Sequence, residues 1–229
     1  MGSRKLSEIL KENLAADQLR DFRVQWDTIS GKDVEALRNV IESAVGEREP
    51  QKFLRKHPLF LVQHLKGGAG RWCIPQKRLG AEHVPDFVIG ERSSLGYEWY
   101  GVELKSPKAH IFTRNGDPAK ELNHALRQIA DWRIWLKKNI DYASRSRNQK
   151  GLGLMDIDSD LPCLILIGRR KDLDEGTQER RRQIGKQNKV QIHTYDWLLD
   201  TVEKRVEILT SGSSDIVSMN LHLQKFDFP

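Results

Sequence analysis

The chain has 229 residues, of which 38 are Lys or Arg and 32 are Asp or Glu, so its formal net charge is +6 and its pI is about 9.3. This length is sufficient for one sizeable core, and the modest basic excess suits a polyanionic partner. No apolar run approaches the length of a membrane span and no signal peptide is visible, so we expect a cytoplasmic protein without a membrane partner. The two cysteines, Cys73 and Cys163, have apolar neighbours, which favours buried thiols over a disulfide or a zinc site.

Two amphipathic helical patterns occupy the first 45 residues. The apolar stripe of the first pattern is formed by Leu6, Ile9, Leu10 and Leu14. The second pattern follows Ser30, which can cap a helix whose apolar face contains Leu37, Ile41, Ala44 and Val45. We therefore expect a small helical N-terminal extension over residues 1–45, a main domain over residues 46–209 and a C-terminal tail over residues 210–229.

The main domain is expected to begin with a helix that has Pro50 in its first turn and ends before Pro58. Glu47 and Glu49 lie near the start of this helix. Carboxylates at a helix N-terminus complement the helix dipole, so capping is the simplest interpretation of both residues.

The two runs that follow, residues 83–90 and 97–105, are rich in β-branched and aromatic residues and are bounded by Gly, Ser or Pro. Both are predicted to be strands. Asp86 lies in the first run, next to Pro85, and Glu103 and Lys105 share one face of the second because side chains alternate along a strand. Two carboxylates and an ammonium group are costly to bury unless they are paired or hold a metal ion.

These residue types suit a hard divalent cation and phosphodiester hydrolysis. Mg²⁺ prefers oxygen ligands and is usually held by one or two carboxylates, with water and substrate phosphate completing the shell. Asp86 and Glu103 can supply the carboxylates, and the backbone carbonyl of Leu104 lies between Glu103 and Lys105. Lys105 can orient the attacking water or stabilise the transition state. The alternative is structural: Asp86 ends an edge strand, and Glu103 and Lys105 form a solvated pair on a wet face.

The remaining pattern continues as an α/β arrangement. Asp117 and Pro118 are expected to start a helix, whose core face is formed by Leu122, Ala125, Ile129, Trp132 and Leu136. A buried strand is predicted over residues 161–168, a charged helix over 174–188, a strand over 190–195 and a last helix capped by Asp196 that ends near Leu209. This order predicts an α/β fold with a mixed central sheet flanked by helices.

The order of an acidic helix, Pro85-Asp86, Glu103-Leu104-Lys105 and a helix with Gln128 and Trp132 resembles the PD-(D/E)xK nuclease superfamily, whose core is restriction-endonuclease-like. Two more stretches, Glu49-x-x-x-Phe53-Leu54-x-x-His57-Pro58 and residues 192–199, are similar to the C-terminal nuclease domain of Shedu-type anti-phage defence proteins. The resemblance covers roughly residues 46–205.

The resemblance implies roles for five side chains. Asp86 and Glu103 would bind the metal and Lys105 would be the catalytic lysine. Glu49, or alternatively Glu47, would be the helix carboxylate that orders a second ion or a water. Gln128 would position the lysine or a phosphate. The family usually has Tyr at the fourth position after this glutamine, whereas this chain has Trp132, whose indole cannot accept a hydrogen bond.

We therefore expect a DNA endonuclease that depends on Mg²⁺, with Mn²⁺ as a substitute, and that acts on double-stranded DNA as a homo-oligomer in anti-phage defence. Arg180, Arg181 and Lys186 lie in a basic segment that can contact phosphates, although a solvated helix face explains that segment equally well. The alternative of another class is a catalytically silent nuclease-like module that binds DNA or a protein. A third possibility is an RNA-processing nuclease.

Overall fold

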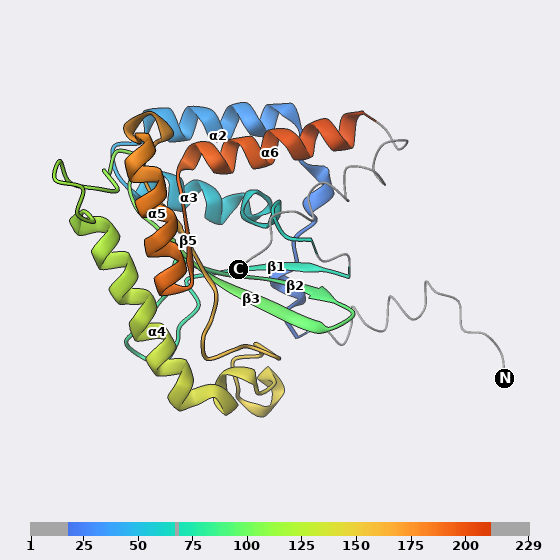
Figure 1. Cartoon of the computed structure of the whole chain (residues 1–229). Helices are drawn as coiled ribbons and strands as arrows, with labels where there is room; N and C mark the ends of the chain where they lie inside the picture. Colours follow the sequence, from blue (N-terminus) through green and yellow to red (C-terminus); the bar gives the residue numbers. More distant parts are fainter. Residues whose placement is uncertain (1–17, 67–68, 212–229) are drawn as a thin grey trace.

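A five-stranded mixed sheet lies at the centre of the computed structural model, which describes residues 18–66 and 69–211 (Figure 1). The strands are β1 (Arg71–Pro75), β2 (Phe87–Ser93), β3 (Gly96–Leu104), β4 (Cys163–Leu166) and β5 (Val190–His193), and they are adjacent in this order. β1, β2 and β3 pair antiparallel, whereas β3, β4 and β5 pair parallel. The α/β class and the mixed sheet predicted from the sequence are confirmed.

Helices cover both faces of the sheet. On one face lie α4 (Lys120–Ser144) and α5 (Glu175–Asn188), which form the crossovers between the parallel strands. On the other face lie α2 (Gly31–Ser43), α3 (Arg48–Lys56) and α6 (Tyr195–Thr210), with α2 and α6 side by side (Figure 1). Five short 3₁₀ helices complete the described part: Arg20–Phe22, Trp26–Thr28, Pro58–Val62, Arg147–Gln149 and Arg170–Asp172.

Alternation along β3 divides the core into two clusters. Val102 and Leu104 point toward α3 and α6, where they join Leu37, Leu54 and Leu198. The opposite face of the sheet packs on α4 through a cluster that includes Trp72, Val88, Trp132, Leu136 and Ile165. Glu103 and Lys105 alternate with the first set, and this register directs both side chains toward α4.

Most of the predicted elements are present with small shifts of their ends. α3 has Pro50 in its first turn and ends before Pro58, and the predicted core face of α4 is buried. Asp174 caps α5 by accepting a hydrogen bond from the backbone N of Thr177 at 2.7 Å. Cys73 and Cys163 are free, buried thiols, as expected. Over the described residues, none of the helices is both long and apolar enough to cross a membrane.

Two of the predicted caps are wrong. α4 begins at Lys120 after Ala119, because the backbone around Asp117 is held in a turn in which the Thr113 N donates to the Asp117 O. α6 is preceded by Thr194, and Asp196 lies inside its first turn, where its carboxylate binds Arg169 instead of capping the helix.

Other details of the sequence prediction also need correction. Asp86 lies one residue before β2 and not inside the strand. β1 was not predicted at all. Val45 lies outside α2 and 76% of its surface is exposed, so it does not continue the apolar stripe.

Residues 1–17 and 212–229, which contain the first predicted helix and most of the tail, lie outside the described residues. The predicted division near residue 45 stays a prediction. α2, which precedes this division, packs on the main domain, because Leu37 and Ile41 share one hydrophobic cluster with Leu198 of α6.

Candidate active site

Glu103 and Lys105 form a buried ion pair at the carboxyl end of β3. The Lys105 Nζ lies 2.7 Å from the Glu103 Oε1, and the two residues are only 5% and 3% exposed, respectively. β3 reaches this point through an apolar sequence that is buried between two helical layers, so the strand carries the pair into the interior. Burying two charges costs several kcal/mol of desolvation per ion before their attraction is counted. The pair is therefore an unusual feature that packing alone does not explain.

The helix α4 closes one side of this pair with Gln128 and His124. The Lys105 Nζ donates to the Gln128 Oε1 at 3.1 Å and lies 3.5 Å from the Nδ1 of His124. Residues four apart lie on the same face of a helix, so both side chains reach the same ammonium group. An ammonium group has three donors, and Glu103, Gln128 and His124 provide one partner for each. The predicted proximity of Gln128 to the lysine is thus present in the structure.

Asp86 joins the cluster from the turn before β2. Its Oδ2 accepts a hydrogen bond from the backbone N of Leu104 at 2.8 Å, and its Oδ1 accepts one from the Nε2 of Gln51 on α3. Asp86 is therefore fixed to the backbone of Leu104, which lies between Glu103 and Lys105 at the end of β3. Burial raises the pKa of Asp86, although the bonds from Leu104 and Gln51 oppose this shift.

The electrostatics of Glu103 are also dominated by burial. Loss of solvent raises the pKa of its carboxyl to about 7, the charge of Asp86 adds to this shift, and Lys105 opposes it. The Glu103 Oε2 is buried, and it has no hydrogen-bond partner among the described residues. An unpaired buried carboxylate oxygen between a second carboxylate and a lysine is a position where a cation or a bound water would satisfy it.

Asp86 and Glu103 fit the type of magnesium site that has few protein ligands. Within residues 18–66 and 69–211, no group of three or more His, Cys, Asp and Glu side chains is arranged to hold a metal ion. Mg²⁺ does not need such a group, because it usually keeps several waters and binds one or two carboxylates. Asp86 and Glu103 supply two carboxylates, and the orphaned Oε2 is consistent with their use as ligands.

The two glutamates at the start of α3 differ in what they contact. Glu49 is exposed and accepts a hydrogen bond from the backbone N of Gly46 at 3.1 Å; hydrogen bonds from its own N–H and from that of Gly46 lower the pKa of its carboxyl. Glu49 thus lies in the first turn of α3 and binds the backbone just before the helix, where its charge complements the helix dipole. The negative charge of Glu47, by contrast, acts on Asp86 and Glu103 and raises the pKa of both.

A residue from α6 supports the lysine from the other side of the sheet. The hydroxyl of Tyr195, which is fully buried, donates to the backbone O of Lys105 at 2.9 Å. This bond fixes the backbone at the point where β3 ends and the chain turns into the loop before α4.

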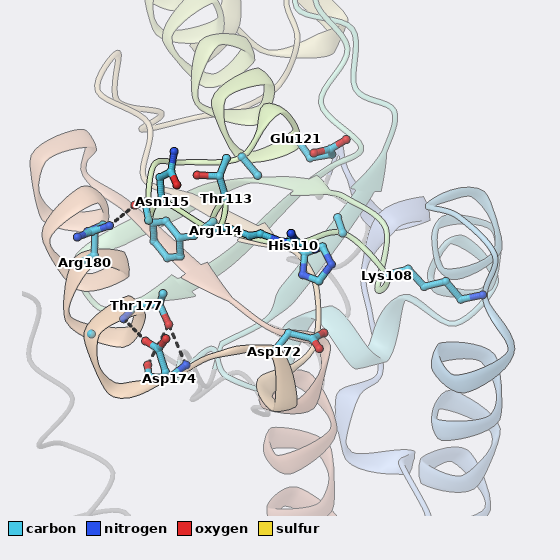
Figure 2. Close-up of a pocket in the computed structure, with 15 residues that line it drawn as sticks. Lys108, His110, Thr113, Arg114, Asn115, Glu121, Asp172, Asp174, Thr177 and Arg180 are labelled. Carbon is cyan, nitrogen blue, oxygen red and sulfur yellow. Dashed lines mark hydrogen bonds between the residues drawn. The ribbon is translucent and has the colours of Figure 1, made fainter.

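An open pocket of 1020 Å³ begins three residues after Lys105, between the loop that precedes α4 and the start of α5 (Figure 2). Its charged lining residues are Lys108, Arg114, Glu121, Asp172, Asp174 and Arg180. Arg180 points toward the turn at Asn115 in Figure 2, and its Nη1 donates to the Gly116 O. Gly116 has φ = +81°, a left-handed backbone conformation that favours glycine in this turn.

Of the three predicted nucleic-acid-binding residues, only Arg180 lines this pocket. Arg181 is half-buried, and its charge lowers the pKa of His193 on β5. Lys186 is exposed in the last turn of α5, distant along the helix from the pocket.

Gln51, His124 and Tyr195 were not selected from the sequence. The spacing of four between His124 and Gln128 is a signal that could have found His124. Gln51 and Tyr195 reach the cluster only because α3 and α6 pack on the sheet, and no local pattern indicates their contacts.

These observations define a mixed α/β protein with a buried carboxylate–lysine cluster where the central strand ends. The comparison with known families agrees with this description. The family model described as "Shedu protein SduA, C-terminal" matches residues 44–199, which is more than half of the chain, and the chain belongs to this family. The match confirms the resemblance to Shedu-type proteins. A search of curated proteins found no match.

Proposed function

We propose that this protein is a metal-dependent DNA endonuclease with a PD-(D/E)xK site and that it acts in anti-phage defence. The observation that carries the proposal is the buried Glu103–Lys105 pair, with Asp86 tied to the intervening residue Leu104. Two buried charges beside a half-buried second carboxylate are expensive, and a catalytic role explains why the chain keeps them. Membership of the Shedu family supports the defence role and the nuclease class.

In this proposal Asp86 and Glu103 hold Mg²⁺, for which Mn²⁺ can substitute, and the Leu104 carbonyl is a further oxygen ligand. When bound, the metal lowers the pKa of a coordinated water and neutralises negative charge on the phosphate. Lys105, held by Glu103 and Gln128, places its positive charge beside the site, where it stabilises the negative charge that develops on the phosphate. The water oxygen forms a bond to phosphorus and the water gives up a proton. The bond from phosphorus to the leaving oxygen breaks, and that oxygen takes up a proton, so the proton count balances.

Glu47 is the better candidate for the helix carboxylate. Its charge acts on both proposed metal-binding carboxylates, whereas the carboxylate of Glu49 is engaged with the N-terminus of α3. We expect Glu47→Gln to reduce the cleavage rate more than Glu49→Gln does. Equal losses in the two variants would contradict this choice.

The direct test compares cleavage of supercoiled plasmid by wild type, Asp86→Asn and Glu103→Gln in Mg²⁺, Mn²⁺ and EDTA. We expect metal-dependent nicking or linearisation by wild type and a loss on the order of 100-fold or more in each variant. Circular dichroism and the thermal midpoint check that the variants are folded.

The silent binding module would be favoured if wild type cut no plasmid in any metal and bound DNA with an affinity that did not depend on the metal. Preferential cleavage of a competing RNA would identify an RNA nuclease. The homo-oligomer, the double-stranded substrate and the cytoplasmic location stay predictions.

A further inference from the structure

The imidazole of His124 is the exposed member of the group around Lys105. Glu103 and Lys105 are buried and Gln128 is half-buried, whereas His124, on the same face of α4 as Gln128, is exposed. Its Nδ1 is 3.5 Å from the Lys105 Nζ. A substrate that approaches the buried pair from solvent would therefore meet His124 before it meets the deeper side chains.

The neighbouring ammonium group determines which nitrogen of His124 carries the proton. Lys105 offers only donors, so the ring nitrogen that faces it must be unprotonated. The remaining proton then lies on Nε2, on the opposite side of the ring. Partial burial and the positive charges of Lys105, Arg127 and Lys120 lower the pKa of His124, with Glu47 opposing them, so the ring is neutral near pH 7.

A neutral imidazole with a fixed Nε2–H is a hydrogen-bond donor without a partner of its own among the described residues. Phosphodiester hydrolysis increases negative charge on the non-bridging oxygens, and preorganised donors that meet this charge accelerate the reaction. Gln128, one helical turn further along α4, accepts from Lys105 through its Oε1 and is half-buried, whereas the His124 ring is exposed to an approaching substrate.

We propose that His124 is a further catalytic residue, which donates its Nε2–H to a non-bridging oxygen of the scissile phosphate while its Nδ1 faces Lys105. This inference rests on the proposed phosphodiesterase function. His124 neither gains nor loses a proton in this role, and the attacking water supplies the proton that the leaving oxygen finally takes. The ligand class of this position is a phosphate group.

Two amide replacements separate this role from simple support of Lys105. The Asn side chain reaches about as far as Nδ1, and the Gln side chain about as far as Nε2, so His124→Gln keeps a distal donor and His124→Asn does not. His124→Ala removes both. Because the ring is exposed, we expect all three variants to fold, and the thermal midpoint verifies this.

The experiment measures kcat and KM for cleavage of a DNA duplex in Mg²⁺ by wild type and the three variants. We expect kcat to fall about 100-fold in His124→Ala and His124→Asn with little change in KM, as for removal of one preorganised donor. His124→Gln should stay within a few-fold of wild type. The matched control is Lys138→Ala, which alters an exposed side chain about four turns further along α4, outside the site and the pocket, and should leave kcat unchanged.

The contrary outcomes are distinguishable. Three results would overturn the role of His124 and leave the nuclease intact. These are an equal kcat in all four proteins, a change in KM without a change in kcat, and a kcat that falls in His124→Gln but is retained in His124→Asn. The last of these results would make His124 a support for Lys105 through Nδ1. No cleavage by wild type itself would overturn the proposed function, and the role of His124 with it.

Discussion

Two clusters of ionisable side chains lie on opposite faces of the sheet, one buried and one half-buried, and loss of solvent has different consequences in each. On the α4 face, Glu103 and Lys105 are paired at 2.7 Å. On the α6 face, His64 and His193 pack with the ring of Trp197, at centroid distances of 5.4 Å and 4.0 Å. Burial lowers the pKa of His64 to about 4 and that of His193 to about 3, so both histidines are neutral.

The comparison shows what burial alone does to a titratable group. Neither histidine forms an ion pair with a carboxylate among residues 18–66 and 69–211, and both lose their charge and pack as aromatic rings. The Glu103–Lys105 pair instead keeps a charge-assisted hydrogen bond in the interior, together with an unsatisfied oxygen. The Nδ1 of His64 also has no hydrogen-bond partner among the described residues, but a neutral ring nitrogen costs much less to leave unpaired than a charged group. The ion pair therefore requires a reason beyond stability.

Breaking the ion pair should have the largest effect on stability. We expect Lys105→Met to destabilise the protein by about 3 kcal/mol, because it leaves a buried carboxylate without its partner. The double variant Glu103→Leu/Lys105→Met removes both charges and should recover most of that loss. Urea denaturation at pH 8 measures both variants, and additive losses in the double variant would refute this view of the pair.

The histidine cluster predicts a loss of stability in acid. Because the folded pKa of each histidine lies below the ordinary value of 6.5, the unfolded chain takes up protons first as the pH falls. The free energy of folding that each neutral histidine contributes is present above pH 6.5, and it is lost as the pH falls toward 4 for His64 and toward 3 for His193. At pH 5 we expect a loss of about 2 kcal/mol for each histidine.

The variants His64→Gln and His193→Gln test this dependence, since an amide does not titrate. Each should flatten the curve of unfolding free energy between pH 7 and pH 5. An unchanged slope in both variants would mean that the rings are not held neutral.

A smaller effect on stability is expected at Tyr195, whose side chain lies on the α6 face of the sheet and binds the backbone of Lys105. Tyr195→Phe keeps the buried ring and removes the hydroxyl that donates to the Lys105 O. We expect a loss of about 1 kcal/mol in stability, the usual net value of one hydrogen bond. If the bond positions the lysine, kcat should also fall while KM is retained. Full activity at reduced stability would restrict Tyr195 to a structural role.

The smallest expected effect concerns DNA affinity. Arg180→Ala removes one cation from the pocket beside the site and should reduce the slope of log affinity against log salt by about one. The control is Arg182→Ala on the same helix, because Arg182 is exposed and lies 3.1 Å from Glu179, its partner in an ion pair. Equal salt slopes in the two variants would show that the pocket is not on the path of the DNA.

The sequence was sufficient for those features that depend on local patterns. The period of apolar residues predicted α4, the positions of Pro50 and Pro58 predicted the ends of α3, and the alternation of side chains placed Glu103 and Lys105 on one face. β1 was missed because its five residues follow a glycine-rich stretch and form a strand only by pairing with β2.

The remainder of the site depends on tertiary packing. Asp86 and Gln51 are 35 residues apart, and Lys105 and Tyr195 are 90 residues apart. No spacing in the sequence encodes these contacts, since they arise when α3 and α6 dock on the sheet. The misplaced caps at Asp117 and Asp196 have a related cause, because one backbone is held in a turn and the other side chain is bound by Arg169.

The central claim is that the buried pair is retained for chemistry and not for stability. The most direct measurement is plasmid cleavage in Mg²⁺ by the variant Glu103→Leu/Lys105→Met beside wild type, with the unfolding free energy of both proteins. We predict a double variant close to wild type in stability that leaves the plasmid intact while wild type cuts it. Cleavage by the double variant at the wild-type rate would contradict the claim, as would a wild type that does not cut in any divalent metal.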